Sequence, residues 1–212
     1  MGPCTHQRLC VGLMGTAARV TWVLLLFPVL AVSQGTGEWD GVMSPAAEDH
    51  LRLGQTAMQR HDLRTALQEF RVALRYSPKA VPIHNALGEA YLASGEVDKA
   101  VVEFRIAIAL GPRFTAAYWN MGRALERRKD FVGAQSFYEG ALRLEPEWPG
   151  AHIALGRALR LQGKLSESKK ELEKALAADP DSREARDELD LTERKLKRPP
   201  EMKTREGPRP TS

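Results

Sequence analysis

Small and apolar residues recur along this chain with a period of about 34 residues. In each copy a large apolar residue precedes a glycine. An alanine or serine, an aromatic residue or leucine, a second alanine and a proline follow at fixed offsets. The six columns are Leu53, Leu87, Met121 and Leu155; Gly54, Gly88, Gly122 and Gly156; Ala66, Ala100, Ala134 and Ser168; Phe70, Phe104, Tyr138 and Leu172; Ala73, Ala107, Ala141 and Ala175; and Pro78, Pro112, Pro146 and Pro180.

The columns predict two helices in each copy, because the glycine has a place inside one helix and the proline stops the other. First helices are expected near 47–60, 81–94, 115–128 and 149–162. Second helices are expected near 63–76, 97–110, 131–144 and 165–178. Glycine within a helix costs ~1 kcal/mol in helix propensity. We expect that the missing side chain lets the two helices of a pair approach closely.

This pattern resembles the tetratricopeptide repeat (TPR), whose signature is Leu-Gly, an aromatic residue, Ala, Phe, Ala and Pro within each repeat. The resemblance covers residues 47–182. It implies an all-α fold, a TPR superhelical solenoid of antiparallel helix pairs. The repeats would be 47–80, 81–114, 115–148 and 149–182. The turn inside repeats two and four contains Gly95 and Gly163, whereas His61 and Lys129 replace glycine in the other two. We expect those two turns to be strained or differently shaped.

Residues 183–197 predict a capping helix, because Ala185, Leu189 and Leu196 keep helical spacing among charged residues. A terminal repeat needs such a polar-backed cap to cover its apolar face. Asp181 or Ser182 is the expected N-cap. Residues 198–212 contain four prolines and no apolar period, which predicts a disordered basic tail.

Residues 1–33 have the pattern of a signal peptide, followed by a linker over 34–46. Arg8 and Arg19 precede an apolar run over 20–32, which is shorter than the ~20 residues that a membrane-spanning helix needs. Cleavage is expected before Gln34, and an uncleaved signal anchor is the alternative. The prediction is an exported protein, in a periplasm, a lumen or outside the cell. Membrane contact is expected only transiently, through the signal peptide.

Charge and cysteine content exclude several classes of chemistry. The chain carries a formal net charge of +4, but the segment 194–212 alone holds seven Lys or Arg and two Glu, so the folded region is not basic. Both cysteines, Cys4 and Cys10, lie before the apolar run. A cleaved chain would therefore have no disulfide, catalytic thiol or cysteine-bound zinc.

No catalytic or cofactor-binding motif is found, so we expect a non-enzyme without cofactors. There is no glycine-rich phosphate loop, zinc signature or nucleophile–base set at recognisable spacing. His50, His84 and His152 share one repeat column, and Tyr118 takes that place in repeat three. We expect these histidines to pack between helices rather than to bind a metal.

By the TPR resemblance, the first helices line a concave groove that holds a partner peptide. The candidate groove residues are Gln55, Asn85, Glu89, Trp119, Asn120, Arg123, Arg157 and Arg160. Tryptophan flanked by arginine is typical of binding hot spots, and a peptide with acidic groups near Arg157 and Arg160 is expected. In the alternative interpretation, Trp119 packs against its neighbours and the arginines pair with Glu89 and Glu126. The lysine and asparagine ladder that binds chaperone tails in one TPR subclass is absent.

Three functions compete. The first is a non-catalytic scaffold that binds a segment of another protein in the groove, on the exported side of a membrane. The second is a structural assembly factor of an envelope or secretion complex, which docks through its outer face. The third is a polyanion binder that acts through the basic tail. We rank them in this order, expect no nucleic acid, and leave self-association open.

Overall fold

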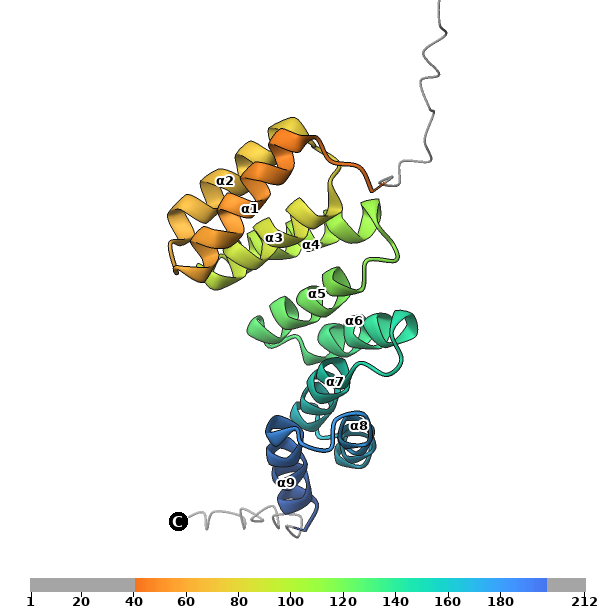
Figure 1. The fold of residues 1–212 in the computed structure, drawn as a ribbon. Coiled ribbons are helices and arrows are strands. Elements are labelled where there is room, and N and C mark those ends of the chain that lie inside the picture. Colours follow the sequence, from red (N-terminus) through yellow and green to blue (C-terminus); the bar gives the residue numbers. More distant parts are fainter. Residues whose placement is uncertain (1–40, 198–212) are drawn as a thin grey trace, which may run out of the picture. The chain divides into compact units, whose positions relative to one another are not determined.

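Helices dominate the part of the chain that can be described. The computed structural model describes residues 41–197, and the predictions for 1–40 and 198–212, including the signal peptide and the tail, lie outside it. Figure 1 shows the helices following one another in pairs. Within 41–197 they are α1 (Pro45–Gln59), α2 (Leu63–Tyr76), α3 (Val81–Ala93), α4 (Val97–Leu110), α5 (Thr115–Arg127), α6 (Phe131–Leu144), α7 (Pro149–Leu161), α8 (Leu165–Ala178) and α9 (Arg183–Lys197).

Two kinds of contact hold these helices together. Each of α1, α3, α5 and α7 packs along the helix that follows it, and the pairs stack through α2 with α3, α4 with α5, and α6 with α7. The first helices also touch one another in order, from α1 to α3, α5, α7 and finally α9. The predicted all-α solenoid is therefore confirmed. The surface that α1, α3, α5 and α7 form together is called the first-helix face below.

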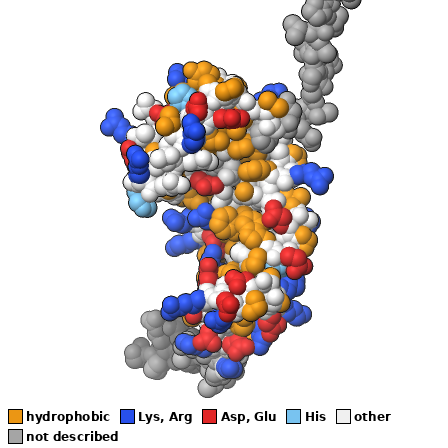
Figure 2. All heavy atoms as spheres, in the orientation of Figure 1, with side chains coloured by type: hydrophobic (Ala, Val, Ile, Leu, Met, Phe, Trp, Pro, Cys, Tyr) orange, Lys and Arg blue, Asp and Glu red, His pale blue; other side chains and the backbone are white. Residues whose placement is uncertain are grey.

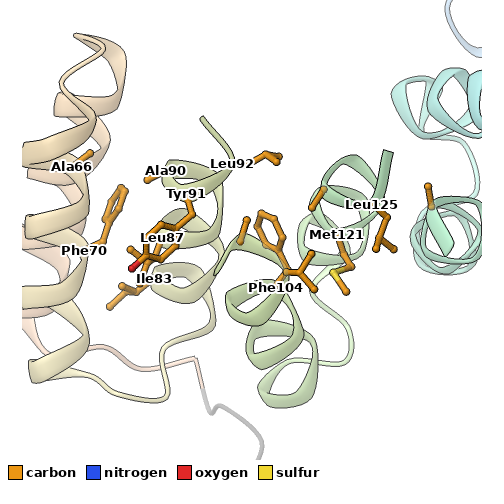
Figure 3. Close-up of a cluster of buried hydrophobic side chains, with 14 of the residues drawn as sticks. Ala66, Phe70, Ile83, Leu87, Ala90, Tyr91, Leu92, Phe104, Met121 and Leu125 are labelled. Carbon is orange, nitrogen blue, oxygen red and sulfur yellow. The ribbon is translucent and has the colours of Figure 1, made fainter. Parts of the chain in front are cut away.

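The glycine column lets the two helices of each pair approach closely, as the sequence predicts. A Cβ on Gly88 would lie 2.5 Å from the ring of Phe104, and one on Gly122 would lie 2.5 Å from the ring of Tyr138. Both rings are fully buried. Phe104 belongs to a continuous core that spans several pairs, part of which is drawn in Figure 3. The aromatic residue of α2, α4 and α6, and Leu172 of α8, thus occupies the space that glycine leaves open.

One residue in each turn inside the pairs has a positive φ, whether or not it is glycine. Gly95 and Gly163 have φ values of 83° and 82°, and His61 and Lys129 have φ values of 58° and 61°. This left-handed region suits glycine and costs energy for residues with a Cβ. The expected strain at His61 and Lys129 is therefore confirmed. The turns also differ in their hydrogen bonds, because the N–H of Val97 donates to the carbonyl of Gly95 and that of Leu165 to Gly163, whereas Asp62 and Asp130 cap the next helix in the other two turns.

The helix bounds agree closely with the pattern. The second helices have the predicted bounds. Each first helix ends one residue before its predicted end. Helix α1 begins two residues earlier than predicted, because Ser44 caps it by accepting a hydrogen bond from the backbone N–H of Ala47. The hydroxyl of Ser182 accepts a bond from the N–H of Ala185, so Ser182 is the residue that caps α9.

Helix α9 covers the last pair, but one of its predicted inward residues is wrong. Ala185 is buried against α7 and α8, and Leu189 packs beside it. Leu196 is 43% exposed, and Thr192 is buried instead and lies 3.1 Å from the hydroxyl of Ser168. At about 100° per residue, Leu189, Thr192 and Leu196 all lie within about 40° of Ala185 around the helix, so Leu196 keeps the stripe. It lies in the last turn of α9, which ends at Lys197.

None of the helices in residues 41–197 combines the length and the apolar character that crossing a membrane requires.

Candidate functional site

The first-helix face carries two hollows, and the predicted groove residues are distributed around them. The first hollow has a volume of about 430 Å³, and Gln55, Asn85 and Glu89 line it. The second has a volume of about 330 Å³, and Arg123 and Arg157 line it. Trp119, Asn120 and Arg160 are not among the residues that line either hollow.

A hydrogen-bond network connects the polar residues of α3 and α5. The amide nitrogen of Asn120 donates to Oδ1 of Asn85 at 3.0 Å and to Oε1 of Glu89 at 2.8 Å. Asn85 also donates to Glu89, at 2.6 Å, and Arg123 donates to Oδ1 of Asn120 at 3.1 Å. Asn120 is only 2% exposed, and both of its N–H donors are used. Its side chain therefore fixes Glu89 and Arg123 and has no free donor for a peptide.

Trp119 is half-buried and packs against its neighbours. Its ring lies 5.4 Å from the ring of Trp148 at an interplanar angle of 40°, and the guanidinium of Arg123 lies 4.7 Å from its centre. The indole N–H is buried and has no hydrogen-bond partner among the described residues. A cation over an aromatic ring is stabilised by the ring quadrupole. The packing that the alternative interpretation predicts for Trp119 is confirmed, and the ring also supports Arg123.

The expected excess of positive charge at Arg157 and Arg160 is wrong, because carboxylates surround both residues. Arg157 lies 3.4 Å from Glu126 and 3.0 Å from Glu184, and Arg160 lies 2.8 Å from Glu188. Burial lowers the pKa of Arg157, but the negative charge and hydrogen bonds of Glu126 outweigh it and raise the pKa above its usual value. The pairing of an arginine with Glu126 follows the alternative interpretation.

Sequence reasoning missed the acidic residues of α9 as partners of the first-helix face. Glu184 and Glu188 lie in a segment that reads as a solvated cap, 27 and 28 residues beyond the arginines that they contact. Only the docking of α9 on α7 brings them there. The remaining predicted partner, Glu89, binds the two asparagines rather than an arginine.

Two arginines of α5 keep an unbalanced charge. Neither Arg123 nor Arg127 forms an ion pair with a carboxylate of residues 41–197, and both line the second hollow. Arg127 is not among the eight predicted site residues, although it is exposed and one helical turn beyond Arg123. Figure 2 shows basic side chains gathered near the C-terminal end of α5, whereas acidic and basic side chains mix over α7 and α9. The positive part of the face therefore lies on α5.

Burial raises the pKa of the Tyr138 hydroxyl, and the negative charge of Glu126 raises it further. The hydroxyl is buried and forms no well-aligned hydrogen bond with the described residues. Tyr138 therefore stays neutral at physiological pH, and its ring contributes packing rather than proton transfer.

The histidine column forms a repeated contact that the sequence did not predict. In three repeats the Nδ1 atom lies close to the glutamate 19 residues later: 2.6 Å for His50 and Glu69, 2.8 Å for His84 and Glu103, and 2.8 Å for His152 and Glu171. The constant separation of 19 residues between each histidine and its glutamate was the sequence signal that could have predicted this contact. In these three repeats the contact binds the first helix to the second helix.

The second ring nitrogen of His84 also faces an acceptor, since Nε2 lies 3.0 Å from the carbonyl oxygen of Pro78. Both hydrogen bonds can form only when the ring is protonated at both nitrogens. Burial lowers the pKa of His84, but the bonds to Glu103 and Pro78 outweigh burial and raise the pKa above its ordinary value. In repeat three the hydroxyl of Tyr118 donates to the carbonyl of Pro112 in the same way.

Known structures with similar folds come from several proteins. MamA 41-end from Desulfovibrio magneticus RS-1 is 21% identical, with 73% of this chain and 88% of that chain covered and a TM-score of 0.67. TTC0263 from Thermus thermophilus is 24% identical, with 72% and 84% covered and a TM-score of 0.62. The first TPR of Spaghetti (RPAP3), bound to the HSP90 peptide SRMEEVD, is 27% identical, with 55% and 92% covered and a TM-score of 0.54.

Comparison with curated protein sequences finds no match. The tetratricopeptide repeat family matches the chain over residues 57–125 and 125–187, more than half of its length. The matched residues contain the Leu-Gly or Met-Gly pairs of the second, third and fourth copies and most of the paired helices described above. The chain belongs to the tetratricopeptide repeat family.

Proposed function

We propose that this protein is a non-catalytic scaffold that binds a segment of another protein on its first-helix face. The TPR fold suggests a protein–protein interaction scaffold, and TPR proteins are generally interaction modules without catalytic activity. The observation that carries the proposal is that two hollows lie on this face beside polar groups with unused bonding capacity. In the second hollow these groups are Arg123 and Arg127.

The first hollow supports the same function with a different chemistry. Its lining combines apolar side chains, such as Met58 and Phe114, with Gln55 and Glu89. Oε1 of Glu89 accepts two hydrogen bonds from asparagine, and no bond to Oε2 is formed within the described residues. An extended segment has backbone N–H groups, and this oxygen can accept a hydrogen bond from one of them. The solved complex of Spaghetti with an HSP90 peptide supports peptide binding by this fold, although it does not identify a partner here.

Site-specific photocrosslinking in the native host tests the proposal. A photoreactive amino acid is placed at Gln55 and at Leu161, which line the two hollows, and at exposed Val102 on α4 as a control. We expect one protein to crosslink from both hollow positions and not from the control. Crosslinks from Val102 alone would contradict the proposal and favour an assembly role of the outer face. If a further probe placed within 198–212 is the one that crosslinks, polyanion binding by the tail is favoured.

An exported location is part of the same proposal. It is supported by the arginines and the apolar run of residues 1–33, which lie outside the described residues. Mass spectrometry of the protein purified from its host is expected to find Gln34 as the first residue. An intact N-terminus in the membrane fraction would instead support the uncleaved anchor.

A further inference from the structure

The second hollow is positively charged because one of its three arginines is neutralised and two are not. Its lining contains Arg123, Arg127, Arg157 and a single carboxylate, that of Glu126. Glu126 lies 3.4 Å from Arg157 and balances its charge. The charges of Arg123 and Arg127 remain, without an ion-pair partner in residues 41–197. A ligand that supplies carboxylates to them would complete the charge balance of the site.

Arg123 is held in place before any ligand binds. Its guanidinium lies over the ring of Trp119 at 4.7 Å and donates to Oδ1 of Asn120 at 3.1 Å. Asn120 is itself fixed by Asn85 and Glu89. A guanidinium has five N–H donors, so a bidentate contact to a carboxylate remains available. Because the side chain is already ordered, binding loses less conformational entropy than it would at a mobile arginine.

An apolar wall lies in the same hollow as the arginines. Leu92, Phe131 and Leu161 line it, and Leu161 is 42% exposed. The volume of about 330 Å³ lies at the lower end of the range for ligand pockets, so it suits one or two side chains rather than a large molecule. An apolar side chain of the ligand that covers the exposed Leu161 removes apolar surface from water, which favours binding. The ligand therefore needs a large apolar residue close to its carboxylates.

The α9 helix restricts where an acidic ligand can bind. Its Glu184 and Glu188 pair with Arg157 and Arg160, and because Glu126 also pairs with Arg157, the carboxylates outnumber the arginines at this end of the face. Like charges in proximity repel, so carboxylates of a ligand are disfavoured at the α7–α9 end of the face. The acidic part of the ligand is directed to α5.

We infer that the second hollow selects an acidic protein segment in which at least two Asp or Glu residues flank a large apolar side chain. The carboxylates bind Arg123 and Arg127, and the apolar side chain contacts Phe131 and Leu161. The inference rests on the proposed function, because it names the kind of segment that the first-helix face binds.

Selection of phage-displayed random 12-residue peptides on the purified full chain tests this inference. The peptides are fused at their C-terminus, so no terminal carboxylate takes part. We expect enrichment of peptides with two or more Asp or Glu and a nearby Leu, Ile, Phe or Met. The best peptide is then synthesised with an amidated C-terminus, and its Kd is measured by fluorescence anisotropy.

Two double variants separate the hollow from general charge. In Arg123→Gln/Arg127→Gln the peptide should bind at least roughly tenfold more weakly, since each charge-assisted hydrogen bond exceeds the ~1.4 kcal/mol that corresponds to a tenfold change. Arg113→Gln/Arg128→Gln removes the same charge from exposed residues outside the hollow, and its Kd should stay within about twofold. Circular dichroism checks that both variants remain helical.

Each other outcome overturns the inference. Enrichment of neutral or basic peptides, no enrichment, or acidic peptides that bind both double variants equally would show that these arginines do not select an acidic segment. Crosslinking from Leu161 decides separately whether the face binds a protein at all. A crosslinked partner without acidic residues would leave the proposed function intact and remove only this inference.

Discussion

Replacing Gly122 with alanine is expected to destabilise the third helix pair. The new Cβ would lie 2.5, 2.7 and 2.8 Å from the Cε1, Cδ1 and Cζ atoms of Tyr138. Carbon atoms in contact are normally separated by ~3.5–4.0 Å. The ring is fully buried, so either the ring or one of the two helices has to move by about 1 Å.

The expected magnitude follows from two opposing contributions. Adding a methyl group to a well-packed core costs ~1–3 kcal/mol, and three ring atoms closer than 3.0 Å place this change near the upper end. Alanine recovers ~1 kcal/mol of helix propensity within α5. The net loss in the free energy of unfolding is therefore about 2 kcal/mol. For a domain of this size that corresponds to a fall in Tm of roughly 4–8 °C.

The assay is urea unfolding followed by far-UV circular dichroism, with a double-mutant cycle as its control. Tyr138→Ala alone is expected to cost ~3–5 kcal/mol, because it leaves a cavity. In that background the Cβ at Gly122 has space, so the second substitution should be neutral or stabilise by up to ~1 kcal/mol. If Gly122→Ala is as stable as the parent protein in both backgrounds, close helix approach is not the reason for the glycine column.

Three further predictions concern the turns, the α9 contact and the histidine column. Lys129→Gly should raise the free energy of unfolding by up to ~1 kcal/mol, since the turn has a φ of 61°; an unchanged urea midpoint would contradict the strain. Glu188→Ala should lower the free energy of unfolding by ~3–5 kcal/mol, because it leaves Arg160, whose side chain is only 12% exposed, without its partner. Replacing the exposed Asp190 with alanine should lower it by less than ~1 kcal/mol, and equal losses from the two variants would refute this reasoning. The pKa of His84 is raised on folding, so its stabilisation is complete below about pH 6.5 and disappears as pH rises through the folded pKa. Urea midpoints from pH 5 to 9 should show this fall in the parent protein and lose it in His84→Gln.

The local structure was largely predictable from the sequence. The repeat period sets the helix pairs, because glycine, alanine and proline act on the backbone within a few residues of their own position. The strained turns at His61 and Lys129 were also predictable, since glycine in the equivalent turns showed which backbone conformation to expect.

The partners of the polar side chains were not predictable in the same way. Arg157 contacts Glu126 from one side and Glu184 from the other, 31 and 27 residues away in the chain. Asn120 reaches Asn85 at a separation of 35 residues. Such pairs depend on how one helix pair stacks on the next and on the docking of α9. The sequence predicted a basic half of the groove through Arg123, Arg157 and Arg160, and the stacking left only Arg123 of these three without a carboxylate partner in residues 41–197.

The leucine column shows most clearly what the sequence determines and what only the tertiary structure decides. By itself the sequence determined that Leu53 and Leu87 occupy the same position in successive repeats, because identical spacing forms identical helix pairs. Only the tertiary structure decided that Leu53 is 52% exposed and Leu87 is 2% exposed. Leu87 packs next to the preceding helix pair, whereas no described pair precedes that of Leu53. Burial requires a neighbour as well as an apolar side chain, and only the stacking of the pairs supplies the neighbour.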